Sequence, residues 1–184
     1  FEESESVDLS LRGTSNCYVI SEANRYRFNA SVIGNGTYGI IPDASFHTSD
    51  PSIEPVSVKV LWETNGANIK AAEGEILSDV ILKDGYVHFT STGKEGNALI
   101  AVKDADGKIL WSWHIWMPDQ PVDQTYVNST GTFVMQDRNL GAVRADQGSG
   151  DEYKESHGLL YQWGRKDPFS LDNLSYITWK STST

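Results

Sequence analysis

The chain has 184 residues, of which 39% are hydrophobic and 22% charged, so it can form at least one ordinary domain with an apolar core. Its 15 basic and 25 acidic side chains leave a net charge of -10, which argues against nucleic acids and anionic membranes as partners, because both require a basic surface. No apolar run reaches the roughly 18 residues of a membrane span, and the opening Phe1-Glu2-Glu3 is expected to be the trimmed start of a mature protein.

Two alternating segments predict the first strands. Residues 26–32 place Tyr26 and Phe28 on one face and polar side chains on the other, and residues 56–62 alternate in the same way up to Trp62. Asp84-Gly85 lies between two further β-prone runs and predicts a tight hairpin, because both residues tolerate positive φ.

The strongest strand signal is a second hairpin around Asp106-Gly107. A two-residue loop would pair Val102 with Trp111 and a four-residue loop would pair Val102 with Ile109; both registers keep the same side chains on the same face. One face, expected to point at a second sheet, consists of Ala98, Ile100, Val102, Ile109, Trp111, Trp113 and Ile115. The opposite face consists of Leu99, Ala101, Leu110, Ser112, His114 and Trp116.

These elements predict a mainly β protein in two parts. Residues 1–117 contain about seven or eight short strands at the spacing of an immunoglobulin-like β-sandwich. Pro118 and Pro121 mark a linker, because neither a central strand nor a helix accommodates them. Residues 118–184 are expected to form a smaller, partly irregular α+β segment with a short strand at 132–135. This segment has too little core to fold alone and should dock on the sandwich.

Cys17 is the only cysteine, so the chain has no intramolecular disulfide and no thiolate zinc site. It lies in the apolar run 16–20 and is expected to be a buried, inert thiol; the alternative is a nucleophile or a crosslink. The four histidines have no metal-ligand spacing, and no catalytic or phosphate-binding motif is present. We therefore predict no enzyme activity, no cofactor and no metal site; a hydrolase accessory or catalytic fragment is the alternative. Calcium binding by Asp104 and Asp106, or by the acidic loop 146–155, is left as the alternative to ordinary turn chemistry.

Aromatic residues are the main candidates for ligand contact. Trp62, Trp111 and Trp113 are expected in the core. Trp116, Trp163 and Trp179 are speculative ligand-binding residues, because exposed aromatic rings stack on sugars or on other proteins. The alternative for these three is packing between the two parts of the chain.

Asp137, Arg138 and Asn139 place a carboxylate, a guanidinium and an amide side by side. The arginine can form a two-pronged pair with a carboxylate, and the two flanking residues can cap turns. We predict that this group is a structural knot.

Two stretches of the second part resemble a known family. They are Val134-Met135-Gln136-Asp137-Arg138-Asn139-Leu140-Gly141-Ala142 and Gly158-Leu159-Leu160-Tyr161-Gln162-Trp163-Gly164-Arg165-Lys166-Asp167-Pro168-Phe169. Both resemble the start of the Fibrobacter succinogenes major paralogous domain, which occurs in surface lipoproteins and fimbrial tip-type proteins of gut Bacteroidetes. Residues 16–20, 96–104 and 109–116 resemble the sandwich that precedes it. The Cys-Pro and Gly-Trp-Arg-Leu-Pro stretch usual in that domain does not occur before Thr184.

The resemblance implies an exported, outer-membrane-anchored surface protein with a lipid tether ahead of Phe1. It implies a non-enzymatic adhesion or fimbria-associated role, with surface proteins, fimbrial subunits or glycans as partners. A carbohydrate-binding module that presents aromatic side chains to glycans is the alternative. The resemblance supplies no catalytic residues.

Overall fold

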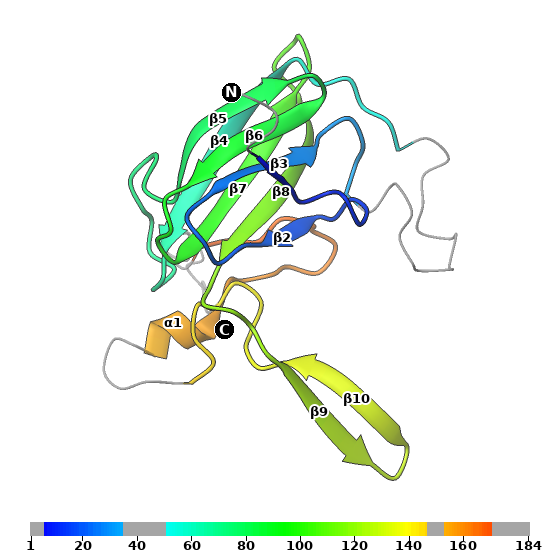
Figure 1. The fold of residues 1–184 in the computed structure, drawn as a ribbon, viewed down its shortest axis with the longest axis vertical. Helices are drawn as coiled ribbons and strands as arrows, with labels where there is room; N and C mark the ends of the chain where they lie inside the picture. Colours follow the sequence, from blue (N-terminus) through cyan, green and yellow to red (C-terminus); the bar gives the residue numbers. More distant parts are fainter. Residues whose placement is uncertain (1–5, 35–50, 147–152, 171–184) are drawn as a thin grey trace, which may run out of the picture.

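A computed structural model describes residues 6–34, 51–146 and 153–170 of the chain. These residues are mainly β and form ten strands and one short helix, labelled in Figure 1. The strands are β1 (Val7–Asp8), β2 (Cys17–Val19), β3 (Arg25–Asn29), β4 (Ser57–Asn65), β5 (Leu77–Lys83), β6 (Tyr86–Ser91), β7 (Gly96–Lys103), β8 (Ile109–Met117), β9 (Asp123–Asn128) and β10 (Gly131–Gln136), and the helix is α1 (Tyr153–His157).

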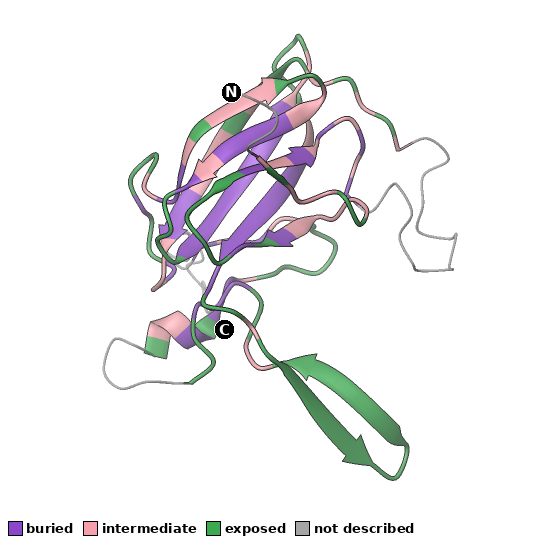
Figure 2. Ribbon diagram, viewed as in Figure 1, coloured by how far each residue is buried: buried purple, intermediate pink, exposed green. Residues whose placement is uncertain are grey.

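Two four-stranded sheets face each other and enclose the core, as Figure 2 shows by the buried strands at its centre. Their strand orders are β1-β3-β6-β5 and β2-β8-β7-β4. All neighbours are antiparallel except β1 beside β3 and β2 beside β8, which are parallel. The ring of Phe28 on β3 lies 5.0 Å from that of Trp113 on β8 and is tilted by 49° to it, so the two sheets meet through packed aromatic side chains.

Both predicted hairpins are confirmed. Asp84 and Gly85 adopt φ of 51° and 79° between β5 and β6. In the second hairpin Val102 pairs with Trp111, but a bulge shifts the register so that Lys103 pairs with Ile109. Leu110 therefore packs against the core, and Ile109, expected in the core, is 46% exposed.

A second bulge corrects the expectation for Trp62. The register of β4 against β7 shifts between Val60 and Trp62, so Val60 pairs with Ile100 and Trp62 pairs with Leu99. Paired side chains share a face, and Leu99 lies on the face turned away from the second sheet. Trp62 therefore lies on the outer face. Trp113 is fully buried as expected, whereas Trp111 is only partly buried at the margin of the core.

Strands β9 and β10 form a hairpin that projects from the two sheets (Figure 1). We call residues 123–136 the arm. Every residue of both strands is exposed, and no other strand among the described residues pairs with them. The strand predicted at 132–135 lies within β10, but β9 was not predicted.

The described residues that follow the arm contact the outer face of the β2-β8-β7-β4 sheet through Gly141, Ala142 and Asp167. We call its described residues, 137–146 and 153–170, the cover segment. It contains α1 and an isolated bridge between Leu160 and Phe169, in line with the small amount of regular structure expected. Leu159 is buried, whereas Tyr161 is 45% exposed and Trp163 is 99% exposed.

Candidate functional site

The cover segment buries the side chains that alternation places on the outer face of β7 and β8. Trp116 is completely buried there, and its Nε1 donates to the carbonyl oxygen of Ala142 at 3.1 Å. The indole has no free face, so Trp116 is not available to stack on a ligand, and its assignment as a ligand-binding residue is wrong. The alternative, packing between the two parts of the chain, holds for this residue.

A buried row of polar side chains connects the sheet to the cover segment. Asn97 on β7 donates from Nδ2 to Asn68 Oδ1 and to the carbonyl oxygen of Gly141, each at 2.9 Å. Asn68 in turn donates to the carbonyl oxygen of Gly158 at 3.0 Å. These bonds satisfy buried polar groups that would otherwise destabilise the contact.

The same row reaches Cys17 through His114. His114 Nε2 lies 2.8 Å from Asn97 Oδ1, and its Nδ1 lies 3.3 Å from Cys17 Sγ. Because the Asn97 amide nitrogen already donates to two acceptors, its oxygen faces His114, so His114 Nε2 carries the proton. His114 Nδ1 is then the acceptor, and the Cys17 thiol donates to it.

Cysteine, histidine and asparagine in this order also occur in cysteine hydrolases, where the pair works as a thiolate and an imidazolium. Here burial raises the pKa of the Cys17 thiol to about 12. Burial, opposed by the charge of Asp167, lowers the pKa of His114 to about 3. Both groups are therefore neutral at pH 7, the opposite of an activated nucleophile, which favours the expected inert thiol. Cys17 is, however, only partly buried and not fully buried as expected.

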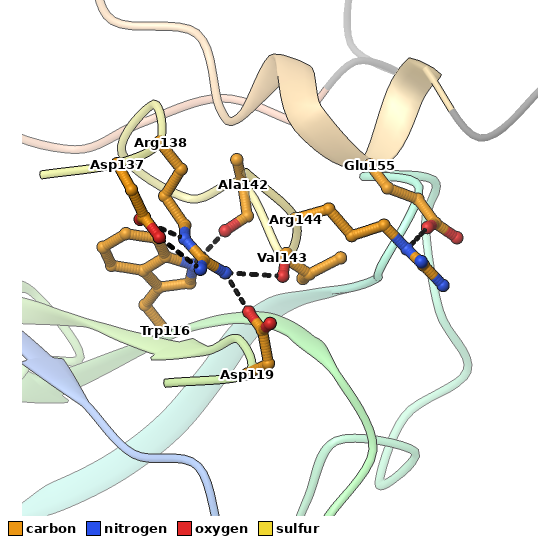
Figure 3. A network of polar contacts seen from close by, with 8 residues as sticks. All are labelled: Trp116, Asp119, Asp137, Arg138, Ala142, Val143, Arg144 and Glu155. Carbon is orange, nitrogen blue, oxygen red and sulfur yellow. Dashed lines mark hydrogen bonds and ion pairs between the residues drawn. The ribbon is translucent and has the colours of Figure 1, made fainter. Parts of the chain in front are cut away.

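Arg138 is the centre of the predicted knot, drawn in Figure 3. Its side chain is 3% exposed. It donates from Nε and from a terminal nitrogen to the two oxygens of Asp137, at 2.7 and 2.9 Å, and to the carbonyl oxygen of Val143 at 2.8 Å. A further contact joins it to Asp119 in the linker (Figure 3). The hydrogen bonds from Arg138 hold the pKa of Asp137 below its usual range.

The rest of the knot closes the cover segment on itself. Asn139 donates to the carbonyl oxygens of Ser156 and His157 in α1, both at 3.3 Å. Gly141 has φ of 84°, and a Cβ there would lie 2.6 Å from Leu159 Cγ, so only glycine fits this crossing. The contacts of Asp137, Arg138 and Asn139 all lie within the protein.

A second anchor joins the cover segment to β8. Lys166 donates to the carbonyl and hydroxyl oxygens of Ser112 at 2.8 and 2.7 Å, and the Ser112 hydroxyl donates to both carboxylate oxygens of Asp167 at 2.8 Å. The ammonium group lies 4.8 Å from the centre of the Trp111 ring. Burial lowers the pKa of Lys166, opposed by its pairing with Asp167. The sequence contained no signal for this anchor, since Ser112 is 54 residues from Lys166 and 55 from Asp167.

Of the candidate ligand-binding tryptophans that lie in the described residues, Trp163 is the one whose side chain is accessible to a ligand. It is 99% exposed and lies two residues after Tyr161, which is 45% exposed. Arg165 beside it stacks on the ring of Phe169 at 4.0 Å. Trp179 lies outside the described residues. The three tryptophans named as ligand-binding therefore do not form one site: one is buried, one is free, and one is not described.

In the described ranges, no group of three or more histidine, cysteine, aspartate or glutamate side chains is placed to hold a metal ion. The Asp104 carboxylate accepts hydrogen bonds from the main-chain nitrogens of Asp106 and Lys108, at 3.0 and 2.8 Å, as hairpin chemistry predicts. Residues 147–152 of the acidic loop lie outside the described residues. At its end Glu155 forms an ion pair with Arg144 (Figure 3).

The arm is the largest exposed feature that sequence reasoning missed. Large apolar side chains lie on both of its faces, namely Tyr126, Val127, Phe133, Val134 and Met135. Residues 124–136 contain no charged side chain. Its turn is held by Asn128, whose Oδ1 accepts from the main chain of Thr130 and Gly131 at 2.8 and 3.2 Å. A cavity of about 450 Å³ lies beside its base and is lined by Val19, Ser21, Glu22, Gln120, Pro121 and Gln136.

No family model, curated protein or solved structure matches the chain. Among the residues that the structure describes, no helix has the length and apolar character needed to cross a membrane.

Proposed function

We propose that this chain is a non-enzymatic cell-surface protein, an adhesion or fimbria-associated component, that uses the arm to contact other surface proteins. The observation that carries the proposal is the arm itself. An isolated two-stranded hairpin is marginally stable in water, yet this one projects with exposed apolar side chains on both faces. Exposed apolar patches of this kind mark interaction sites.

The other properties of the chain agree with this role. The two-sheet body supports our proposal of an immunoglobulin-like sandwich, a rigid support that holds the arm away from the surface. The resemblance of residues 134–142 and 158–169 to the Fibrobacter succinogenes major paralogous domain supports export, an outer-membrane location and an N-terminal lipid tether. The neutral forms of Cys17 and His114 support a structural rather than a catalytic role for that pair.

The proposal is tested with fluorescent beads that carry the protein by its N-terminus, mixed with whole cells of gut Bacteroidetes. The test variant is Tyr126→Ser combined with Phe133→Ser, a cross-strand pair on one face of the arm. We expect the number of beads bound per cell to fall at least tenfold. Trp163→Ala removes an aromatic side chain outside the arm that is even more exposed than Tyr126 and Phe133, and it is the control. Equal binding by wild type and arm variant would contradict the proposal.

The 99% exposure of Trp163 supports glycan binding as a second candidate function. In that case a glycan array gives a signal with the wild type and with the arm variant but not with Trp163→Ala. The two sets of variants therefore separate the candidates.

A further inference from the structure

We infer that the arm binds a second copy of this chain, by antiparallel pairing of the β10 edges of two molecules about a twofold axis. The inference rests on the proposed function, since it names the partner of the same arm. It follows from three properties of the arm: its unpaired edges, the absence of charged side chains from residues 124–136, and the symmetry of its side-chain order.

The edges of the body are protected against pairing, and those of the arm are not. β1 and β2 are only two and three residues long. Lys59 lies on the edge strand β4, and β5 carries a bulge and Lys83. Short edges, bulges and lysine residues are the usual means of preventing edge-to-edge association. None of these features is found between residues 124 and 136.

The register of the hairpin identifies the groups that are turned outward. The main-chain nitrogen of Asp137 donates to the carbonyl oxygen of Val122 at 3.0 Å, and hydrogen-bonded pairs alternate with unbonded pairs along an antiparallel ladder. The unbonded pairs are therefore Asp123 with Gln136, Thr125 with Val134, and Val127 with Thr132. On β10 the N–H and C=O groups of Thr132, Val134 and Gln136 point away from β9.

These outward groups suit a second copy. When two β10 strands pair with Val134 opposite its own symmetry mate, Thr132 faces Gln136 and Phe133 faces Met135. Each apolar side chain then meets an apolar one, including a favourable contact between sulfur and an aromatic ring. The β9 edge is less suitable, because the same symmetry about Thr125 would place Asp123 opposite Val127.

Charge favours the same arrangement. Each chain carries a net charge of -10, so two bodies repel each other. Strands of six residues extend about 20 Å, so paired arms hold the bodies apart by more than the Debye length of about 8 Å at physiological salt. Residues 124–136 carry no charge and are thus where two copies approach with little repulsion. Because the contact is small, the dimer should be weak and depend on concentration.

Sedimentation velocity of the whole chain, from 1 µM to 1 mM under reducing conditions, tests the inference. We expect the wild type to shift from monomer to dimer over this range. Val134→Lys and Val134→Glu, each alone, should remain monomeric because like charges oppose each other across the axis. An equimolar mixture of the two should dimerise again. Thr125→Lys, the residue directly opposite Val134 within the arm, is the control and should dimerise like the wild type.

Any one of four results would overturn the inference. These are a wild type that stays monomeric, a Val134→Lys variant that dimerises, an equimolar mixture of Val134→Lys and Val134→Glu that stays monomeric, and a Thr125→Lys variant that stays monomeric. The bead adhesion assay described above distinguishes failure of the dimer from failure of the proposed function. If the wild type is monomeric but beads still adhere to cells through the arm, the partner is a strand of another protein, and the function stands. If the dimer forms but adhesion does not depend on the arm, the inference stands without that function.

Discussion

Replacing Arg138 with alanine is the most direct test of how the cover segment is held. The substitution removes the guanidinium from Asp137, whose side chain is 12% exposed, and from the carbonyl oxygen of buried Val143. Breaking one partner of a buried ion pair costs about 3–5 kcal/mol. The contact with Asp119 adds little, because that carboxylate is 62% exposed and screened by solvent. We expect a loss near the lower limit, about 3 kcal/mol.

Amide hydrogen exchange locates this loss in the chain. A change of about 3 kcal/mol corresponds to roughly a 150-fold decrease in protection, since 1.4 kcal/mol is a factor of ten. The decrease should be confined to the cover segment, while β3 and β6 retain wild-type protection. Arg138→Lys keeps the charge without the two-pronged geometry, so its effect should be smaller. Unchanged protection of the cover segment in Arg138→Ala would refute the reasoning.

The pKa of Asp137 adds a dependence on pH to the same test. Arg138 lowers the pKa of Asp137 in the folded protein, so the ion pair contributes in full above the unfolded value of about 3.9. The contribution is lost as the pH falls through the lower, folded value. The difference in protection between wild type and Arg138→Ala should therefore shrink below pH 4.

Four further predictions concern other parts of the chain. The pKa of His114 is about 3 in the folded protein and about 6.5 in the unfolded chain, so below pH 6.5 the unfolded chain binds a proton that the folded protein does not. The free energy of unfolding should therefore fall by up to about 1.4 kcal/mol per pH unit, and in His114→Gln the free energy from urea unfolding should change less between pH 6 and 4. Cys17 should resist iodoacetamide at pH 7 until the protein is unfolded; rapid labelling of the native protein, seen by mass spectrometry, would contradict its protonated state. Trp113→Ala should cost about 3–5 kcal/mol in urea unfolding, and Trp111→Ala clearly less because it is partly exposed; equal losses would argue against the burial difference. Residues 118–184 alone should show no cooperative thermal transition by circular dichroism, because the few apolar side chains that they bury, namely Ala142, Val143 and Leu159, are too small a core for a separate domain. A sharp transition would show that these residues fold independently.

Local chemistry explains which elements could be predicted from the sequence. Asp84-Gly85 determines its hairpin through two adjacent residues that accept positive φ. The alternation around Trp113 is uninterrupted, so its burial followed directly. Trp62 and Ile109 were misplaced because a bulge adds one residue to a strand and turns the following side chains to the other face. No local pattern in the sequence marked either bulge.

The contacts between the β2-β8-β7-β4 sheet and the cover segment could not be predicted, because they join segments that are distant in the sequence. Trp116 alternates onto an outer face, and only the cover segment, reached after the arm, explains why that face is buried. Strand β9 was missed because its apolar residues, Tyr126 and Val127, are adjacent and point to opposite faces, which gives no alternation. Arg138 was correctly placed in a knot with Asp137 because their pairing requires only neighbouring residues.

The parallel pairing of β2 with β8 has a consequence for the order of folding. Cys17 and His114 are neighbours in this pairing although 97 residues separate them in the chain. At a synthesis rate of 5–20 residues per second, β2 waits about 5–20 s for its partner strand to emerge from the ribosome. During that time the Cys17 thiol has no imidazole beside it and no strand to cover it. Its protection from a thiol reagent therefore records the moment at which β8 pairs with β2 and completes the β2-β8-β7-β4 sheet.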